Sequence, residues 1–201
     1  MTAQLRFFKM LLLLGIIGVA FLSCEDSRFN IISKISNKKK SVGQKIDSLN
    51  GVYVYYNGPT NTVVGRNTTP DGYNLGLEYQ CVEFVKRYYY EHLDHKMPNS
   101  YGHAKDFFDK NLADGQYNAE RNLRQYSNPS KRKPKVDDLV VLDKTMFNSF
   151  GHIGLVSKVE GNQLEIIQQN KPSSRVKYEL ENSAGTWRIK NSRILGWLGK
   201  E

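Results

Sequence analysis

Residues 79–90 have the sequence Tyr-Gln-Cys-Val-Glu-Phe-Val-Lys-Arg-Tyr-Tyr-Tyr, and this stretch decides how the chain is expected to fold. Apolar side chains recur every three or four positions, at Val82, Val85 and Tyr89, which predicts an amphipathic helix with one buried face. The residues just before it are rich in glycine and asparagine, which predicts a loop that leads into the helix. The pattern therefore places Cys81 at the start of a helix.

Cys81 has two interpretations at this position. The positive end of a helix dipole stabilises a thiolate, the nucleophilic form of cysteine, so Cys81 can serve as a catalytic nucleophile. Free cysteines are also among the most buried residue types, and a structural role agrees equally well with this stretch alone. A histidine that can act as the base would favour the catalytic interpretation.

The chain has four histidines that are candidates for this base. His92 follows Cys81 on the same predicted helix, about 16 Å further along its axis, which excludes direct contact. His95 lies further still, and His103 is expected to be a solvated loop residue. His152 is the better candidate, because it follows a glycine at the start of a predicted strand and can project into a cleft.

His152 begins the first strand of a predicted hairpin whose turn is residues 161–162. If paired residue numbers sum to 322, Gln168 lies opposite Gly154 and is a diagonal neighbour of His152, about 7–8 Å away between backbones. A slip of one residue would place Gln169 there instead. Either amide can accept a proton from the imidazole and fix its tautomer, and simple packing is the alternative role of these residues.

The remaining segments predict a mixture of helices and strands. A short helix is expected within residues 42–49 and a second helix over residues 104–112. Residues 51–56 predict a strand, and residues 57–73, rich in Gly, Asn, Thr and Pro, predict a long loop. Further strands are expected over residues 138–142, 152–159, 163–169, 176–180, 186–189 and 194–198.

Residues 1–24 predict an export signal. Two basic residues precede an apolar run, residues 11–21, which is short for a membrane span. The run ends in Phe-Leu-Ser-Cys, which resembles a bacterial lipobox, although phenylalanine stands where leucine is commonest. Under this interpretation Cys24 carries lipid and forms no disulfide with Cys81. An ordinary signal peptide and an uncleaved anchor are the alternatives.

The length of 201 residues predicts one domain with a short extension. We expect a signal peptide over residues 1–23, a flexible tether over residues 24–48 and the domain over residues 49–201. The formal net charge of +9 favours an anionic partner, although solubility alone would explain it equally well. The sequence contains no zinc-type cysteine cluster, phosphate-binding glycine loop or RNA-binding signature, so we predict no metal, cofactor or nucleic-acid partner.

Four motifs in order resemble the CHAP family, the cysteine- and histidine-dependent amidohydrolases and peptidases, and especially the amidase domain of glutathionylspermidine synthetase/amidase. The resemblance covers about residues 51–199. It implies a papain-like α+β fold, with N-terminal helices packed on an antiparallel β-sheet, and we expect a monomer. The four motifs are residues 80–88, 151–156, 167–170 and 194–197.

The resemblance also implies a set of roles for the site residues. Cys81 would be the nucleophile, His152 the base and Gln168 the residue that orients the imidazole. The backbone N–H of Cys81, together with Gln80, is expected to stabilise the oxyanion, and Asn170 is expected to shape the site. The relative named above has glutamate in place of Gln168, and a neutral amide stabilises an imidazolium less.

Together with the export signal, these features predict an exported enzyme, lipid-anchored on the periplasmic or outer-surface side of a bacterial membrane. Its substrate would be the amide bonds of peptidoglycan peptides. The alternatives are an amidase acting on a glutathionylspermidine-like conjugate and a catalytically weak, wall-binding lipoprotein. An enzyme of this kind is expected to carry a Cys81 thiol that titrates well below the ordinary value of about 8.5.

Overall fold

The structure is a computed structural model of the chain and describes residues 40–201. The predicted signal peptide, the predicted lipidation at Cys24 and most of the predicted tether lie outside the described residues. Residues Ser41–Glu201 form one compact unit. None of the helices in this part of the chain has the length and apolar character needed to span a membrane.

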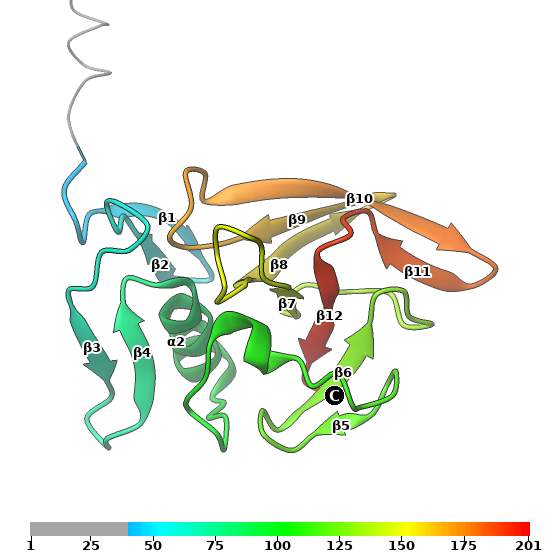
Figure 1. Cartoon of the computed structure of the whole chain (residues 1–201), viewed down its shortest axis with the longest axis horizontal. Helices are drawn as coiled ribbons and strands as arrows, with labels where there is room; N and C mark the ends of the chain where they lie inside the picture. The colour runs from blue at the N-terminus through cyan, green and yellow to red at the C-terminus, as the bar shows by residue number, and fades with distance from the viewer. Residues whose placement is uncertain (1–39) are drawn as a thin grey trace, which may run out of the picture. The chain divides into compact units, whose positions relative to one another are not determined.

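An eight-stranded antiparallel sheet is the main element of the unit (Figure 1). Its strand order is β11-β10-β9-β8-β7-β12-β6-β5. The strands are β5 (Tyr117–Asn118), β6 (Leu123–Ser127), β7 (Leu139–Leu142), β8 (His152–Glu160), β9 (Gln163–Ile167), β10 (Arg175–Ser183), β11 (Thr186–Ile189) and β12 (Ile194–Gly199).

Two small antiparallel hairpins precede the large sheet in the chain. The first pairs β1 (Lys45–Leu49) with β2 (Val52–Tyr55), and the second pairs β3 (Gly65–Thr68) with β4 (Asn74–Glu78). The α-helix α2 (Cys81–Leu93) follows β4 directly, and the 3-10 turn η1 (Ala104–Phe107) comes after it.

Helix α2 packs one apolar face on the sheet. Phe84, Val85 and Tyr88 are completely buried and share a hydrophobic core with Val141 and Ile153 of the two central strands. The opposite face of the sheet carries a second core of buried residues around Trp197. Because successive side chains of a strand point to opposite faces, each central strand contributes to both cores.

The predicted fold class is wrong in its helical part. The described residues contain a single α-helix, α2, and far more strand than helix, so no set of N-terminal helices packs on the sheet in a papain-like α+β arrangement. The sheets are antiparallel, as expected.

The helix expected within residues 42–49 is strand β1 instead. Asn50 and Gly51 both have positive φ, 47° and 85°, and together they form the two-residue turn that joins β1 to β2. An Asn-Gly pair between two strand-like segments is the strongest short-range hairpin signal, because a hairpin turn of this kind needs positive φ at both positions. The turn signal therefore favours a strand over the predicted helix for the residues that precede Asn50.

The helix expected over residues 104–112 is only the 3-10 turn η1. The carboxylate of Asp109 accepts a hydrogen bond from the backbone N–H of Asn111 at 2.9 Å. Such local side-chain bonds compete with the helical backbone pattern, so the chain turns instead of continuing as a helix.

The β8–β9 hairpin contains a bulge that sets the register at the candidate site. Next to the turn, Glu160 pairs with Gln163, and these residue numbers sum to 323. Beyond a register shift between Val156 and Lys158, Leu155 pairs with Ile167, and the sum is 322, as predicted. The register near His152 therefore agrees with the prediction because one extra residue in β8 offsets the different turn.

Candidate active site

Cys81 is the first residue of α2, and backbone N–H groups surround its sulfur. Gln80, the residue before the helix, makes no side-chain capping bond, so the N–H groups of the first turn are not used by a cap. The backbone N–H groups of Ile153, of Val82 and of Cys81 itself interact with the sulfur of Cys81, a residue of intermediate exposure. Ile153 belongs to β8, so this contact joins the start of the helix to the start of that strand.

Burial raises the pKa of the Cys81 thiol above its ordinary value. The N–H groups of Ile153 and Val82 and the charge of Lys171 act in the opposite direction, without reversing the shift. The expected depression of the thiol pKa by the helix terminus is therefore wrong in sign, because desolvation of the thiolate outweighs the helix and its neighbours. The thiol is protonated at neutral pH and needs a base to become a nucleophile.

The His152 side chain is buried, 3% exposed, and its Nε2 lies 2.9 Å from Oε1 of Gln168. The amide Nε2 of Gln168 donates to the carbonyl oxygen of Ser173 at 3.0 Å, and this bond turns Oε1 toward the imidazole. Since Oε1 can only accept, Nε2 of His152 carries the hydrogen. This tautomer leaves Nδ1 of His152 unprotonated and able to accept a proton.

Burial, together with the positive charges of Lys171 and Arg193, lowers the pKa of His152 to about 3, while the Gln168 bond acts in the opposite direction. The imidazole is therefore neutral at physiological pH. A neutral imidazole next to a protonated thiol is suited to general-base catalysis, in which the thiol loses its proton as it attacks.

Cys81 and His152 are not directly hydrogen-bonded to each other in the described chain. They are linked through Ile153, whose N–H interacts with the sulfur and which follows His152 in β8. Catalytic hydrogen bonds are often long in the ligand-free state and shorten when substrate binds.

Gln80 and Asn170 are bound to each other. Asn170 donates from Nδ2 to Oε1 of Gln80 and to the carbonyl oxygen of Thr60, the latter at 3.0 Å. Gln80 donates from Nε2 to the carbonyl oxygen of Thr62 at 2.8 Å. Asn170 has a φ of 61°, in the left-handed region that asparagine tolerates well. The pair therefore anchors the loop of residues 57–64 beside the helix start.

A buried polar network behind the site is the main feature that the sequence analysis missed. Gln169 is completely buried and donates from Nε2 to the carbonyl oxygen of Gln80 at 3.0 Å and to Glu83 Oε2 at 2.8 Å. Its Oε1 accepts from the N–H of Tyr55 at 2.8 Å. Glu83 is paired with Arg87 at 2.6 Å. The i,i+4 spacing of these charges on the predicted helix was the available signal.

Gly154 allows β9 to approach β8 beside the imidazole. A Cβ atom at this position would lie 2.6 Å from Cγ2 of Ile166, 2.9 Å from the carbonyl oxygen of Ile167 and 3.3 Å from Cβ of Gln168. A side chain at this position would therefore collide with β9 next to Gln168.

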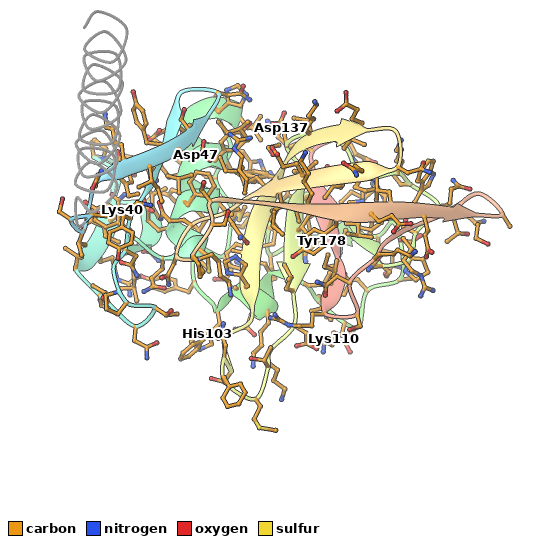
Figure 2. All side chains as sticks on the ribbon, turned by 90° about the horizontal axis from the view of Figure 1, so that it is seen from above. Lys40, Asp47, His103, Lys110, Asp137 and Tyr178 are labelled. Atoms are coloured by element: carbon orange, nitrogen blue, oxygen red, sulfur yellow. The ribbon has the colours of Figure 1, made fainter. Side chains whose placement is uncertain are left out.

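The other histidines lie away from this site. His95 is buried against the carbonyl oxygen of Arg121 at 2.9 Å. His92 lies 3.0 Å from the side chain of Asn50. His103 is exposed at the periphery of the molecule, as expected, and packs on Phe150 (Figure 2).

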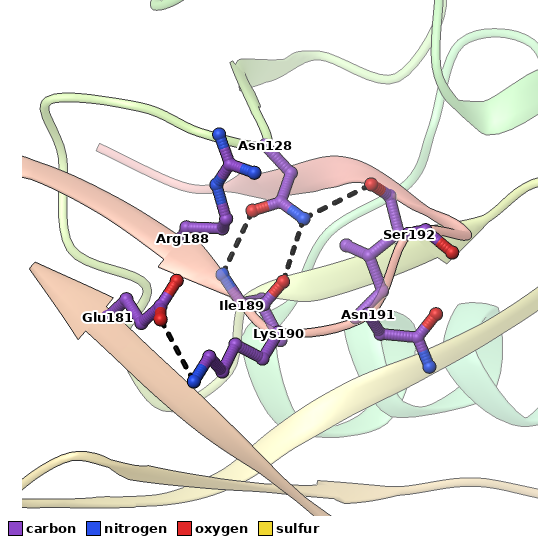
Figure 3. A pocket seen from close by; sticks show the side chains of 8 residues that line it. Asn128, Glu181, Arg188, Ile189, Lys190, Asn191 and Ser192 are labelled. Carbon is purple, nitrogen blue, oxygen red and sulfur yellow. Dashed lines mark hydrogen bonds and ion pairs between the residues drawn. The ribbon is translucent and has the colours of Figure 1, made fainter.

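A polar groove of about 640 Å³ lies where β10, β11 and β12 come together (Figure 3). Asn128 binds the backbone of Ile189 and Ile194 there, and Lys190 pairs with Glu181. None of the site residues expected from the sequence lines this groove. Within residues 40–201, no group of three or more His, Cys, Asp or Glu side chains could hold a metal ion.

Comparisons with known proteins identify a family for this chain. The CHAP domain family matches residues 70–170 of the chain. Trypanothione synthetase from Crithidia fasciculata is 28% identical over 131 residues, which are 62% of this chain and 20% of that protein. The chain thus matches only about a fifth of the length of this curated relative.

A solved structure, described as the crystal structure of Ly7917, shows a weaker likeness. It is 16% identical, the match covers 60% of this chain and 53% of that chain, and the TM-score is 0.34. The family assignment therefore comes from the sequence match, which spans half of the chain and contains Cys81, His152 and Gln168. This chain belongs to the CHAP domain family, a family of amidases and peptidases.

Proposed function

We propose that this chain is a thiol amidase or endopeptidase that hydrolyses amide bonds in peptidoglycan peptides, with Cys81 as nucleophile and His152 as general base. One observation carries the proposal. A buried imidazole is held in a defined tautomer by Gln168, and the next residue, Ile153, directs its N–H at the sulfur of a cysteine that begins a helix.

In the first step, the Cys81 sulfur bonds to the amide carbonyl carbon while Nδ1 of His152 takes the thiol proton. The imidazolium then gives this proton to the leaving nitrogen as the C–N bond breaks. The products of this half-reaction are a free amine and a thioester on Cys81.

In the second step, water attacks the thioester and gives one proton to His152. The C–S bond breaks, a carboxylic acid leaves, and the proton returns to the thiol. The oxyanion of both steps would be stabilised by the backbone N–H of Cys81. Gln80 is the proposed second donor. Its Nε2 donates to the carbonyl oxygens of Thr62 at 2.8 Å and Thr60 at 3.5 Å, and the longer of these two bonds would give way to the oxyanion.

The peptidoglycan assignment rests on the sequence. Residues 21–24 resemble a lipobox, and a lipid anchor at Cys24 would place the domain on the periplasmic or outer-surface side of a bacterial membrane. Peptidoglycan is the abundant amide-containing polymer in that location. A chain that begins at Cys24 lacks Arg6 and Lys9 and carries a net charge of +9 − 2 = +7, which favours an anionic polymer of this type.

A second candidate substrate is a glutathionylspermidine-like conjugate, which the similarity to trypanothione synthetase favours. A catalytically weak, wall-binding lipoprotein is the alternative outside the enzymes. Its main support is the neutral Gln168, which stabilises an imidazolium less than a carboxylate would.

The test is digestion of purified peptidoglycan by the full chain, with products identified by mass spectrometry, for the wild type and for Cys81→Ala. We expect new muropeptides from the wild type alone. If neither protein releases fragments but the wild type cleaves a peptide–polyamine amide, the second substrate class replaces the first. If Cys81→Ala is as active as the wild type on either substrate, or if neither substrate is cleaved by a folded wild type, the proposed function is wrong.

A further inference from the structure

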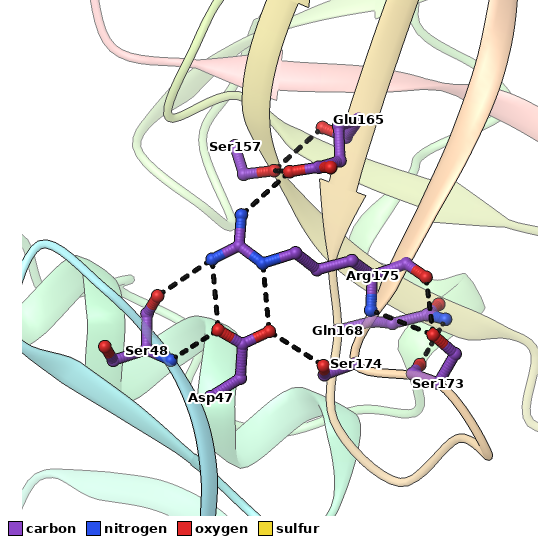
Figure 4. Close-up of polar contacts among 8 residues, drawn as sticks. All are labelled: Asp47, Ser48, Ser157, Glu165, Gln168, Ser173, Ser174 and Arg175. Carbon is purple, nitrogen blue, oxygen red and sulfur yellow. Dashed lines mark hydrogen bonds and ion pairs between the residues drawn. The ribbon is translucent and has the colours of Figure 1, made fainter.

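Arg175, the first residue of β10, binds three parts of the chain at once (Figure 4). Its Nε and Nη2 contact the carboxylate of Asp47 at 2.9 and 3.1 Å, and its Nη1 contacts Oε1 of Glu165 at 2.7 Å. Nη2 also donates to the carbonyl oxygen of Ser48 at 2.9 Å. All three guanidinium nitrogens are therefore used, and they link β1 with β9 and β10.

The turn between β9 and β10 carries the contacts that fix Gln168. The backbone N–H of Gln168 donates to the carbonyl oxygen of Ser174 at 2.8 Å, and its amide Nε2 donates to that of Ser173 at 3.0 Å. Ser174 is itself tied to β1, because its Oγ donates to Oδ2 of Asp47 at 2.7 Å. A continuous chain of bonds thus runs from Asp47 through Ser174 to Gln168 and ends on the imidazole of His152.

The contact between Arg175 and Asp47 has a defined geometry. An arginine–carboxylate pair with two parallel bonds fixes direction as well as distance. The side chains of Asp47 and Glu165 are 19% and 18% exposed, whereas that of Arg175 is 36% exposed, so water screens these ion pairs in part. The hydrogen bonds from Arg175 and Ser174 outweigh the effect of burial and lower the pKa of Asp47, which keeps the carboxylate charged at neutral pH.

We propose that Asp47, Ser174 and Arg175, here called the β1 clamp, are positioning residues for the active site. The clamp holds the turn after β9 so that Gln168 keeps Oε1 on Nε2 of His152 and Nδ1 remains the base. This inference rests on the proposed function. All three residues lie outside the segment that matches the family, residues 70–170, so the clamp is a feature of this chain beyond the matched region. Figure 2 shows Asp47 on β1.

The experiment uses the full chain and the variants Asp47→Ala, Ser174→Ala and Arg175→Lys. Lysine keeps the charge of Arg175 but cannot make two parallel bonds, so it separates geometry from charge. We expect kcat for amide hydrolysis to fall about tenfold to a hundredfold in Asp47→Ala and Arg175→Lys, and less in Ser174→Ala, with KM little changed.

A second readout reports positioning without depending on hydrolysis. In ¹⁵N-histidine-labelled protein, the nitrogen shifts of His152 distinguish the Nε2–H tautomer from the Nδ1–H tautomer, and the signal is assigned by its loss in His152→Gln. We expect the wild type to hold the Nε2–H form and the clamp variants to show a mixture of the two.

Glu179→Gln is the matched control. Glu179 is also on β10 and forms an exposed pair with Lys190 at 3.0 Å, but it has no connection to Gln168. We expect wild-type kcat and a wild-type tautomer for this variant. If Asp47→Ala does not fold, Ser174→Ala, which removes only one hydroxyl, decides the question with the same two readouts.

The outcomes separate the two proposals. Unchanged kcat and an unchanged tautomer in folded clamp variants would overturn the positioning role, while inactivity of Cys81→Ala would leave the proposed function intact. An altered tautomer in a protein whose Cys81→Ala variant is fully active would retain the clamp and reject the catalytic role of the cysteine. An effect on thermal stability alone, with both readouts unchanged, would show that the clamp is only structural.

Discussion

At the start of α2, backbone N–H groups hold the Cys81 sulfur, whereas at the start of β8 a side-chain amide holds the His152 imidazole. Both groups are desolvated and both are neutral at rest, because burial raises the pKa of the thiol and lowers that of the imidazole. The difference lies in what supports them. Only a substitution by proline removes a backbone N–H group, so other substitutions leave the contacts at the helix start in place. The contact at the strand start depends instead on side chains, in a series of hydrogen bonds that reaches β1.

The largest expected effect comes from removing the base itself. His152→Gln should lower kcat about 10³-fold, within the range that general-base catalysis usually supplies. His92→Gln is the matched control, since His92 is exposed and its contact with Asn50 lies away from Cys81. Steady-state hydrolysis kinetics measure both variants. Comparable rates for the two variants would show that β8 does not carry the base.

The low pKa of His152 also predicts a dependence of stability on pH. The unfolded chain binds a proton on this imidazole below about pH 6.5, whereas the folded chain resists protonation until about pH 3. Stability is therefore lost as the pH falls between these values, by at most about 4–5 kcal/mol for this residue. Urea unfolding at a series of pH values should show a flatter dependence for His152→Gln than for the wild type. Parallel curves would mean that His152 is accessible to protons in the folded state.

A smaller effect is expected where β9 approaches β8. Gly154→Ala would place a methyl group 2.9 Å from the carbonyl oxygen of Ile167, and overpacking of this kind costs about 1–3 kcal/mol. The strand must shift, so Gln168 loses its place and kcat falls as well. Gly65→Ala is the control, because its nearest contact would be an ordinary 3.7 Å. Equal unfolding free energies for the two variants would argue against a tight approach at Gly154.

The smallest effect concerns Lys171, whose charge lowers the pKa values of both Cys81 and His152. In Lys171→Met the thiol pKa should rise, so alkylation of Cys81 by iodoacetamide should shift to higher pH. Lys177→Met removes a lysine of β10 that has no such influence on the thiol and should titrate like the wild type. If alkylation of Cys81 in Lys171→Met shifted to lower pH instead, the effect assigned to the Lys171 charge on the thiol pKa would have the wrong sign.

The start of α2 and the start of β8 also differ in how far sequence patterns could predict them. The start of α2 follows from a glycine-rich loop and a three-to-four-residue apolar period, and the structure begins the helix at Cys81 as predicted. The contact of Gln168 with His152 was also predicted, from the hairpin alone. That prediction is correct only because of the bulge between Val156 and Lys158, and no local signal in the sequence indicated this bulge.

Three features of the structure were not predicted, either because local sequence patterns do not encode them or because a pattern was overlooked. The Asn50-Gly51 turn was a readable hairpin signal, and it was missed in favour of a helix. The burial of Gln169 between α2 and β2 joins segments that are distant in the chain, so spacing could not indicate it. The raised thiol pKa was missed because a helix dipole can be predicted from sequence, whereas the amount of water removed from a sulfur cannot.

The sequence by itself determined the nucleophile and base candidates, the helix start, the hairpin and the family, because each depends on residue types at short, regular spacing. Only the tertiary structure decided the mostly β architecture, the protonation states of Cys81 and His152 and the link from Asp47 to Gln168. The physical reason is that desolvation and long-range hydrogen bonds depend on which distant segments pack together. That packing is a property of the whole fold and is absent from any single stretch of the chain.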